Sequence, residues 1–330
     1  MKGLLSIAVA VAALAAVPLV VHSNVVFNFL AATLVIALAG QGWNILGGYG
    51  GQYSFGHAAF FGTGAFMNAI LQVQYDVNAW ISFAVGIAAG AIVGAIIGGL
   101  AFRAGLRSSY FALVTLAFAE VLRILASIAP ITGAGVGLLV KLDLRVQSFQ
   151  FHSRAAFYFV ILALVALALV IARFLERSRF GTWLIAVREN EDAAMALGVD
   201  TFAIKLAAMV LSATITAAAG CFYVQYFLFI DSGIAYGTWI SIEALLTPII
   251  GGVGSVFGAL VGALAVKSLG EGAKLVTGDV PGLDLMIYGA VLILVIRFAP
   301  RGIVGAFADT RERVARRFIA GTSVREAIRG

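Results

Sequence analysis

The chain has 330 residues, of which 62% are hydrophobic and only 12% are charged, and its mean hydropathy is +1.04. An ordinary soluble domain is about 45–50% apolar and about 25% charged, so the composition excludes a soluble globular protein. The net charge of +6 does not indicate nucleic acid binding, because the basic residues gather in expected loops and at the C-terminus. A single cysteine, Cys221, excludes an intrachain disulfide.

Apolar runs of membrane-spanning length recur along the chain. A run of about 20 apolar residues crosses a hydrocarbon core about 30 Å thick as an α-helix, and the short alternating strands of an outer-membrane barrel are not seen in the sequence. We therefore predict an all-α polytopic membrane protein, a single membrane domain over residues 1–330 with about ten transmembrane segments. The expected segments are residues 4–21, 25–46, 54–74, 79–101, 109–129, 155–173, 203–230, 239–250, 254–268 and 283–299.

The first segment, residues 4–21, allows two interpretations. Lys2 and a short apolar core fit a secretory signal peptide, but no small-x-small cleavage pattern stands clearly before His22. We favour a retained span, with a cleaved signal peptide as the alternative.

Glycine is abundant, with 38 residues, and falls into two kinds of pattern. Within residues 79–101, GIAAGAIVGAIIGG places small residues three and four apart, which favours close helix packing in a membrane. Two clusters, GGYGGQYSFGH at 47–57 and GGVGS at 251–255, instead interrupt apolar segments, and the two segments beside GGVGS are short for a span. They indicate either broken helices that line a path or tight turns at the membrane interface. The glycines expected to break helices are Gly47, Gly48, Gly50, Gly51, Gly251, Gly252 and Gly254.

The basic residues predict the orientation of the chain, because cytoplasmic loops collect lysine and arginine. With ten spans, four basic groups fall on one side, which places both termini, the loop 174–202 and a basic tail at 301–330 in the cytoplasm. The loop 130–154 on the other side is balanced in charge. The four groups are Lys2; Arg103 and Arg107; Arg173, Arg177, Arg179, Arg188 and Lys205; and Arg301, Arg311, Arg313, Arg316 and Arg317.

Ionisable residues inside spans are costly and mark internal pairs or a transport path. Glu120 and Arg123 lie three apart, hence on one helical face, which fits a structural pair, a subunit contact, or the lining of a path for a charged or zwitterionic solute. Glu243 has no basic neighbour in its segment and is either a path residue or wet at the outer interface. His57 is either a packing residue or part of the path. The path candidates are Gln52, Ser54, His57, Glu120, Arg123 and Glu243.

The sequence carries no enzyme motif. It lacks a G-x-x-x-x-G-K-[ST] phosphate loop, a Cys/His metal cluster and a G-x-S-x-G nucleophile motif. We expect no metal and no cofactor in this chain, so transport would be driven by a partner or by an ion gradient.

The stretch AVRENEDAAMALGVD, residues 186–200, is charged although membrane-length apolar runs lie on both sides of it. Acidic residues at its start favour a first helical turn, the alanines favour helix, and Gly198 is placed to end it. We predict a short cytoplasmic helix that binds a protein partner, because an anionic membrane surface would repel its acidic start. A membrane-surface linker is the alternative. The helix residues are Arg188, Glu189, Glu191, Asp192, Ala193, Ala194 and Gly198.

Within this stretch, NEDAAMALGVD resembles the EAA loop of permeases of ATP-binding-cassette (ABC) importers, whose acidic residue, two alanines and glycine form the coupling helix. Asp192, Ala193, Ala194 and Gly198 hold those positions, with aspartate where glutamate is usual. The blocks GQYSFGHAAFFGTGAF, YFALVTLAFAEVLR, GGVGSVFGALVGA and FAPRGIVG resemble the branched-chain amino acid permease family of LivM type, in its order. Ala134 and Ala259 depart from its usual glycine and proline, and permeases for urea and short amides share the family, so the solute stays open.

The resemblance implies two inverted helix bundles in a bacterial cytoplasmic membrane and a path shared with a second, homologous permease of LivH type. It also implies two cytoplasmic ATPases, which would bind ATP and magnesium and receive the coupling helix, and a periplasmic solute-binding protein. The competing interpretations are an ion-coupled secondary transporter and a scaffold that transports nothing.

Overall fold

The computed structural model describes residues 2–21 and 23–277, together with 282, 283, 286, 287, 289, 290, 293, 297 and 302–306. Apart from those positions, the expected last span, 283–299, and the basic tail, 301–330, lie outside the described residues. The described part is almost entirely helical, and seven of its helices are long and apolar enough to cross a membrane. The prediction of an all-α polytopic membrane protein is confirmed, while the count of ten spans stays a prediction.

The first half of the chain forms long helices with short connections. Its elements are α1 (Lys2–Ala15), α2 (Val17–Val20), α3 (Asn24–Trp43), the π-helix η1 (Asn44–Tyr49), α4 (His57–Tyr75), α5 (Ala79–Arg103) and α6 (Ser108–Ile128). A longer connection then carries the 3-10 turns η2 (Pro130–Thr132) and η3 (Val146–Ser148) and the strand β1 (Leu138–Leu139).

The second half places short helices between long ones. Its elements are α7 (Arg154–Arg177), α8 (Arg179–Glu189), α9 (Glu191–Ala196), α10 (Thr201–Phe227), β2 (Phe229–Ile230), α11 (Ser232–Ala235), α12 (Thr238–Gly251) and α13 (Gly258–Thr277). The strands β1 and β2 pair antiparallel, with Leu138 opposite Ile230.

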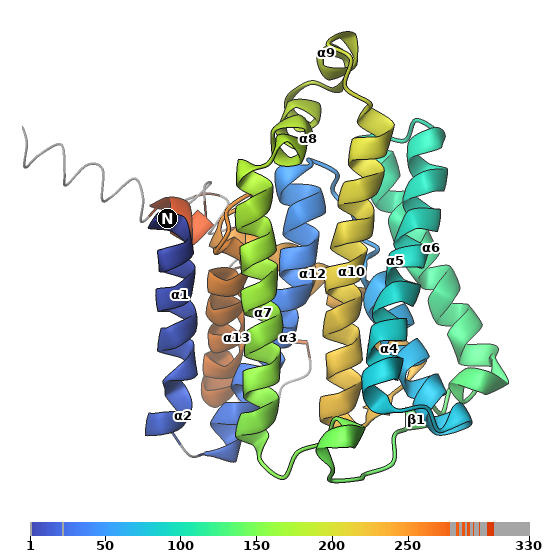
Figure 1. Ribbon diagram of the computed structural model, residues 1–330, viewed down its shortest axis with the longest axis vertical. Helices are drawn as coiled ribbons and strands as arrows, with labels where there is room; N and C mark the ends of the chain where they lie inside the picture. Colours follow the sequence, from blue (N-terminus) through green and yellow to red (C-terminus); the bar gives the residue numbers. More distant parts are fainter. Residues whose placement is uncertain are drawn as a thin grey trace, which may run out of the picture.

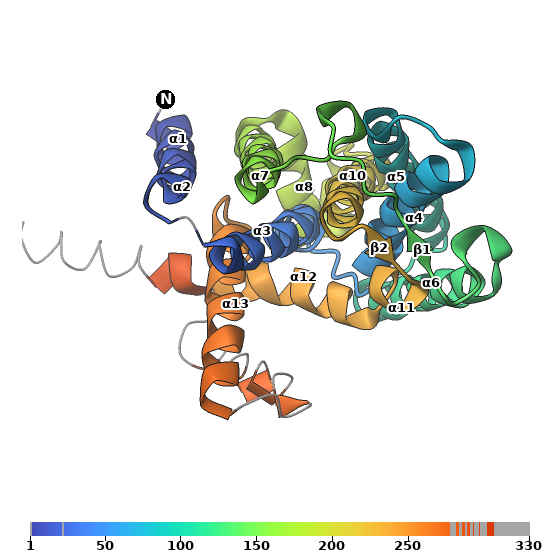
Figure 2. The same cartoon turned by 90° about the horizontal axis from the view of Figure 1, so that it is seen from below.

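The long helix α10 lies at the centre of the bundle and contacts α3, α4, α5 and α7 (Figure 2). In Figure 1, α8 and α9 project from one end, which we call the α8 end, and β1 lies at the opposite end, the β1 end. Seen from below in Figure 2, α7 and α10 are nearly end-on whereas α12 is seen lengthwise. The helix α12 therefore crosses the bundle at a steep angle to its neighbours.

The segment expected at 254–268 is longer than the sequence predicts. α13 continues to Thr277 and has 20 residues, although it is not one of the seven candidate spans. α12 itself has 14 residues, but together with α11 it forms the stretch Ser232–Gly251, which is one of the seven, so this segment is also longer than the sequence predicts. Lys267, which lies near the expected end, pairs with Glu243 of α12 at 2.7 Å between Nζ and Oε1. The ion pair offsets the cost of a charged side chain in apolar surroundings.

Glycines on α5 bring its backbone close to that of α10. A Cβ atom on Gly90 would lie 2.3 Å from the Cβ of Ala217, and one on Gly94 would lie 2.4 Å from the Cβ of Ala213. These distances are far inside van der Waals contact, so a larger side chain requires one helix to move. The predicted role of this glycine pattern in helix packing is confirmed.

We expect Gly94→Leu to lower the stability of the protein in detergent, because the new side chain must displace Ala213; overpacking of this kind costs about 1–3 kcal/mol. Gly99→Leu is the matched control, since nothing lies within 4 Å of a Cβ on Gly99. Thermal unfolding should show a lower midpoint for Gly94→Leu than for Gly99→Leu. Equal midpoints would contradict close packing of α5 on α10.

Candidate functional site

The charged stretch forms the end of α8 and the whole of α9, not a single helix. Asn190 separates the two: its backbone is extended (φ −158°, ψ 104°), and its side chain accepts a hydrogen bond of 3.0 Å from the amide of Ala193, which caps α9. Glu189 is therefore the last residue of α8, which corrects its predicted place in an acidic first turn. Gly198 follows α9 with φ +86°, as expected of a residue that ends a helix.

Basic residues of the same chain hold the acidic start of α9. Arg107, in the connection between α5 and α6, contacts Glu191 through Nε at 3.3 Å and Asp192 through Nη2 at 3.0 Å. Lys205 of α10 forms a second ion pair with Glu191. The hydrogen bond that Arg107 donates to Asp192 and the charge of Glu191 raise the pKa of Arg107 above its usual value. Glu191 is thus mostly enclosed and ties α9 to the bundle, while Asp192 also faces outward.

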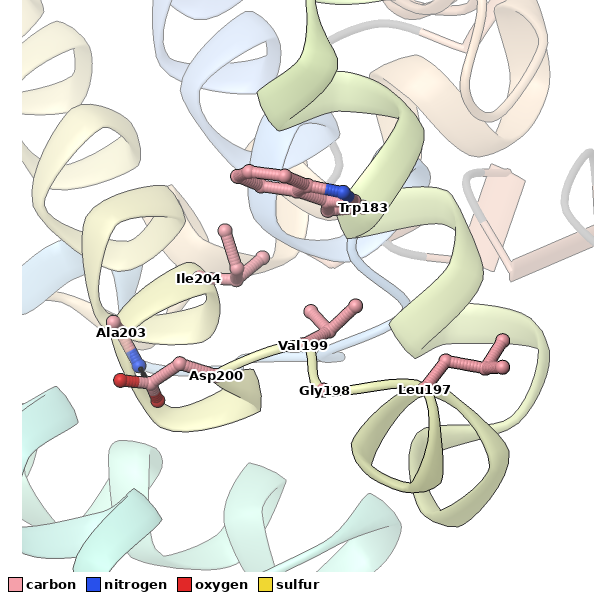
Figure 3. Close-up of a pocket in the computed structure, with 7 residues that line it drawn as sticks. All are labelled: Trp183, Leu197, Gly198, Val199, Asp200, Ala203 and Ile204. Carbon is pink, nitrogen blue, oxygen red and sulfur yellow. Dashed lines mark hydrogen bonds between the residues drawn. The ribbon is translucent and has the colours of Figure 1, made fainter.

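The outward surface of this loop is largely apolar. Ala194 is buried against the bundle, whereas Leu197 is 86% exposed and Trp183 of α8 is 46% exposed. Beside them, an open cavity of about 390 Å³ lies between α8 and the start of α10 (Figure 3). The residues that line it are Trp183, Leu197, Gly198, Val199, Asp200, Ala203 and Ile204. An apolar surface with charged neighbours is typical of a protein contact.

The two glycine clusters meet at the α8 end of the bundle. A Cβ atom on Gly48, in η1, would lie 2.7 Å from the amide nitrogen of Gly254, in the turn after α12. The buried side chain of Asn44 bridges the two segments: Oδ1 accepts from the amide of Gly254 at 2.8 Å, and Nδ2 donates to the carbonyl of Ser255 at 2.9 Å. We call the contact of Asn44 and Gly48 with Gly254 and Ser255 the glycine junction.

All seven glycines expected to break helices lie at or beside this junction. Gly51, Gly252 and Gly254 have φ of +67°, +136° and +70°, values that glycine adopts far more readily than other residues. Of the others, Gly47 and Gly48 lie in η1, Gly50 follows it, and Gly251 ends α12.

Arg188 attaches α8 to the glycine junction. Its Nη1 donates to the carbonyl of Gly48 at 2.9 Å, while Nε and Nη2 donate to Oε1 of Glu189 at 3.1 and 2.6 Å. Next to this contact, the hydroxyl of Tyr49 donates to Oε1 of Glu176 at the end of α7, at 3.0 Å. The charged loop and both glycine clusters, which are far apart in the sequence, therefore form one site.

After η1 the backbone leaves the helix at the α8 end and runs into the bundle. Residues 50–56 lead to the start of α4, where His57 and Ser212 of α10 share a hydrogen bond of 2.9 Å. Ser212 lies about three turns into α10, about 16 Å from its first residue at the usual rise. The indole of Trp43 donates to the carbonyl of Ser54 at 2.8 Å, so protein groups satisfy the unwound backbone. The first cluster thus begins at the α8 end and continues as unwound backbone into the bundle, whereas the second is a turn at the α8 end.

Three of the path candidates are enclosed in the chain. Ser54 and His57 are fully buried, in packing positions inside the bundle. Glu243 is also buried, so it is not wet at an outer interface in the described chain, and it forms an ion pair with Lys267 of α13. The sequence could not show this pair because the two residues lie on different helices. Gln52 is half-buried in the unwound segment.

The other two candidates, Glu120 and Arg123, lie on the outer surface of the described chain. They pair as their spacing predicts, with Nη2 of Arg123 2.6 Å from Oε1 of Glu120 and Nε 2.9 Å from Oε2. Their side chains are 41% and 37% exposed, although they stand in the middle of an apolar helix. An exposed ion pair at this position requires a neighbour other than lipid hydrocarbon.

Sequence reasoning missed two buried amides in α3 and η1. Asn44 forms the bridge of the glycine junction, and Gln41 lies one turn before it. Neither amide atom of Gln41 has a hydrogen-bond partner among the described residues. The signal was present, because polar side chains in the apolar run QGWNILGG need partners that the run itself does not provide.

A family model described as "Branched-chain amino acid transport system / permease component" matches residues 25–296. The chain belongs to this permease family. The permease is 27% identical to the high-affinity branched-chain amino acid transport system permease protein LivM of Escherichia coli K12 over 296 residues, 82% of this chain and 68% of that one. It is 26% identical to LivM of Salmonella typhimurium LT2 over 296 residues, with the same coverage, and 30% identical to LivH of Escherichia coli K12 over 150 residues, 46% of this chain and 47% of LivH. No solved structure matches.

The permease is a multi-pass membrane transport protein and not an enzyme, as its relatives are permease subunits. Its described residues include no group of three or more His, Cys, Asp or Glu side chains that could hold a metal ion.

Proposed function

We propose that this permease is the membrane-spanning subunit of an ATP-driven importer of branched-chain or related amino acids in a bacterial cytoplasmic membrane. The main support is the segment that contains α8, α9 and the residues up to Asp200, which we call the α8–α9 loop. A short, capped helix projects from one end of the bundle, exposes an apolar tip at Leu197, and is tied by ion pairs to Lys205 and Arg107. Such a loop can be pushed by a partner and pass the displacement to the helices that hold it.

The loop is proposed to bind one of two cytoplasmic ATPases, which hold ATP and magnesium. The exposed tip and the cavity beside Trp183 are the contact surface, and the α8 end therefore faces the cytoplasm with both termini. The basic residues Arg107, Arg179 and Arg188 at this end support that orientation. A periplasmic solute-binding protein would then approach the β1 end.

The translocation path is proposed to run along α6, between this permease and a second one. Support comes from the ion pair of Glu120 and Arg123, which would face lipid if nothing covered this face of α6. A carboxylate beside a guanidinium also presents one charge of each sign, which complements a zwitterionic amino acid. The half-buried Gln52 is a further path residue under this proposal, with Ser54 and His57 positioned behind the surface.

ATP-dependent uptake by the reconstituted complex tests the function. Radiolabelled leucine should accumulate only with ATP and the binding protein, and other branched-chain amino acids should compete for uptake. Competition by urea or short amides instead would assign the solute to that branch of the family. Accumulation by this chain alone on a Na⁺ or H⁺ gradient would replace the proposal with a secondary transporter.

We expect Leu197→Asp to weaken ATPase binding, because a desolvated carboxylate would replace an apolar contact at the centre of the interface. A loss of one such contact typically lowers affinity by about tenfold or more. Co-purification of the ATPases measures it. Val146→Asp, an exposed apolar residue at the β1 end, is the control and should retain the ATPases. Equal retention by both variants would contradict the proposed docking surface.

We expect the double variant Glu120→Gln/Arg123→Gln to lower uptake by about tenfold or more, because contacts with a charged partner are each worth over 1 kcal/mol. The double change leaves no unpaired charge in the membrane, so insertion and ATPase binding should persist. Initial uptake rates at fixed amounts of complex are the measurement. Unchanged uptake would show that the pair is only structural.

A further inference from the structure

We propose that Arg188 is the positioning residue through which the α8–α9 loop acts on the helices of the bundle. The inference rests on the proposed function, since it concerns how a displacement of this loop by an ATPase reaches the membrane segments. It assigns that step to one guanidinium group at the glycine junction.

The contact of Arg188 with Gly48 has a clear physical cause. The carbonyls in the last turn of a helix have no partners within the helix, and a cation is favoured there by the helix dipole. Gly48 lies in the last turn of η1, and Nη1 of Arg188 donates to its carbonyl at 2.9 Å. The arginine therefore caps the end of the continuous α3–η1 helix from outside the helix.

The side chain of Arg188 reaches this carbonyl across a glycine. A Cβ atom on Gly51 would lie 2.5 Å from Cγ of Arg188, which is too close for any contact between carbon atoms. Gly51 also has φ +67°, so both its backbone and its surroundings favour glycine. The first glycine cluster thus leaves the space through which the side chain of Arg188 reaches η1.

The second glycine cluster shares the same point. Asn44 joins η1 to the turn after α12 by two hydrogen bonds, and Gly48 packs directly on Gly254. Nη1 of Arg188 also lies 3.6 Å from the position of a Cβ on Gly254. A movement of α8 therefore acts on α3 and on the α12–α13 turn together, and not on one helix alone.

The geometry uses the shape of arginine as well as its charge. Nε and Nη2 donate to Glu189, which leaves Nη1 directed at Gly48. Lysine has a single ammonium group without a planar fork, so it cannot hold Glu189 and Gly48 in this arrangement. Two other anchors, Arg107 and Lys205, hold α9 through Glu191 and Asp192, so they tie the loop to α10 and to the α5–α6 connection and do not reach the glycine junction. Arg188 is the loop residue that contacts both the η1 carbonyl and the space beside Gly254.

The test uses the whole importer, with this permease, its partner permease, both ATPases and the binding protein, in liposomes. Arg188→Gln and Arg188→Lys are compared with Arg179→Gln, which removes the same charge from an exposed position at the other end of α8. Three quantities are measured: the ATPases that co-purify, the rate of ATP hydrolysis, and the solute imported per ATP hydrolysed.

We expect Arg188→Gln to retain the ATPases and their hydrolysis but to import about tenfold less solute per ATP, within the usual range of coupling between sites. Arg188→Lys should fall between it and wild type, and Arg179→Gln should match wild type. Because Arg188→Lys keeps the charge, it tests the inference even where Arg188→Gln fails to assemble.

Wild-type import per ATP in every Arg188 variant that assembles overturns the inference, as does an equal loss in Arg179→Gln. A wild-type complex without ATP-driven uptake would instead overturn the proposed function. The two failures are therefore distinguishable in one set of measurements.

Discussion

The structure depends on one requirement: backbone amides and carbonyls that leave a helix in apolar surroundings must find partners in the protein. Two such places, the end of η1 and the turn after α12, lie close together at the α8 end and are joined by hydrogen bonds. The side chain of Asn44 satisfies an amide and a carbonyl of the turn after α12, and Arg188 satisfies the carbonyl of Gly48. The path of α3, the turn between α12 and α13, and the place of α8 all follow from these contacts.

The same requirement explains how charge is distributed in the protein. Inside the bundle, Glu243 is matched by Lys267, and at the α8 end Glu191 is matched by Lys205 and Arg107. Two features remain exposed on the described chain. The α8–α9 loop exposes an apolar tip at Leu197, and α6 exposes the ion pair of Glu120 and Arg123. The two surfaces therefore suit different kinds of partner.

Much of this was accessible from the sequence, because hydropathy and spacing are local properties. The long helices, the small-residue packing of α5, the pair of Glu120 and Arg123, and the helix end at Gly198 all follow from neighbours within a few residues. Contacts across the chain were not accessible. The local sequence of GGYGG does not predict that it packs against GGVGS, about two hundred positions later. Glu243 had no visible partner in its own segment because Lys267 belongs to another helix. The boundary at Asn190 was missed because good helix formers on both sides masked its cap.

The glycine junction and the adjoining turn after α12 also limit which substitutions this chain can accept in evolution. Every amino acid other than glycine carries a Cβ, and at Gly48 that atom would sit 2.2 Å from Oδ1 of Asn44, while at Gly251 it would sit 1.8 Å from the carbonyl oxygen of Gly258. The amide of Gly254 also lies only 2.7 Å from a Cβ on Gly48, so at both positions a backbone atom stands in the way and a side-chain change elsewhere cannot make room. Lineages that carry this arrangement are therefore expected to keep both glycines, even where the apolar helices around them vary freely.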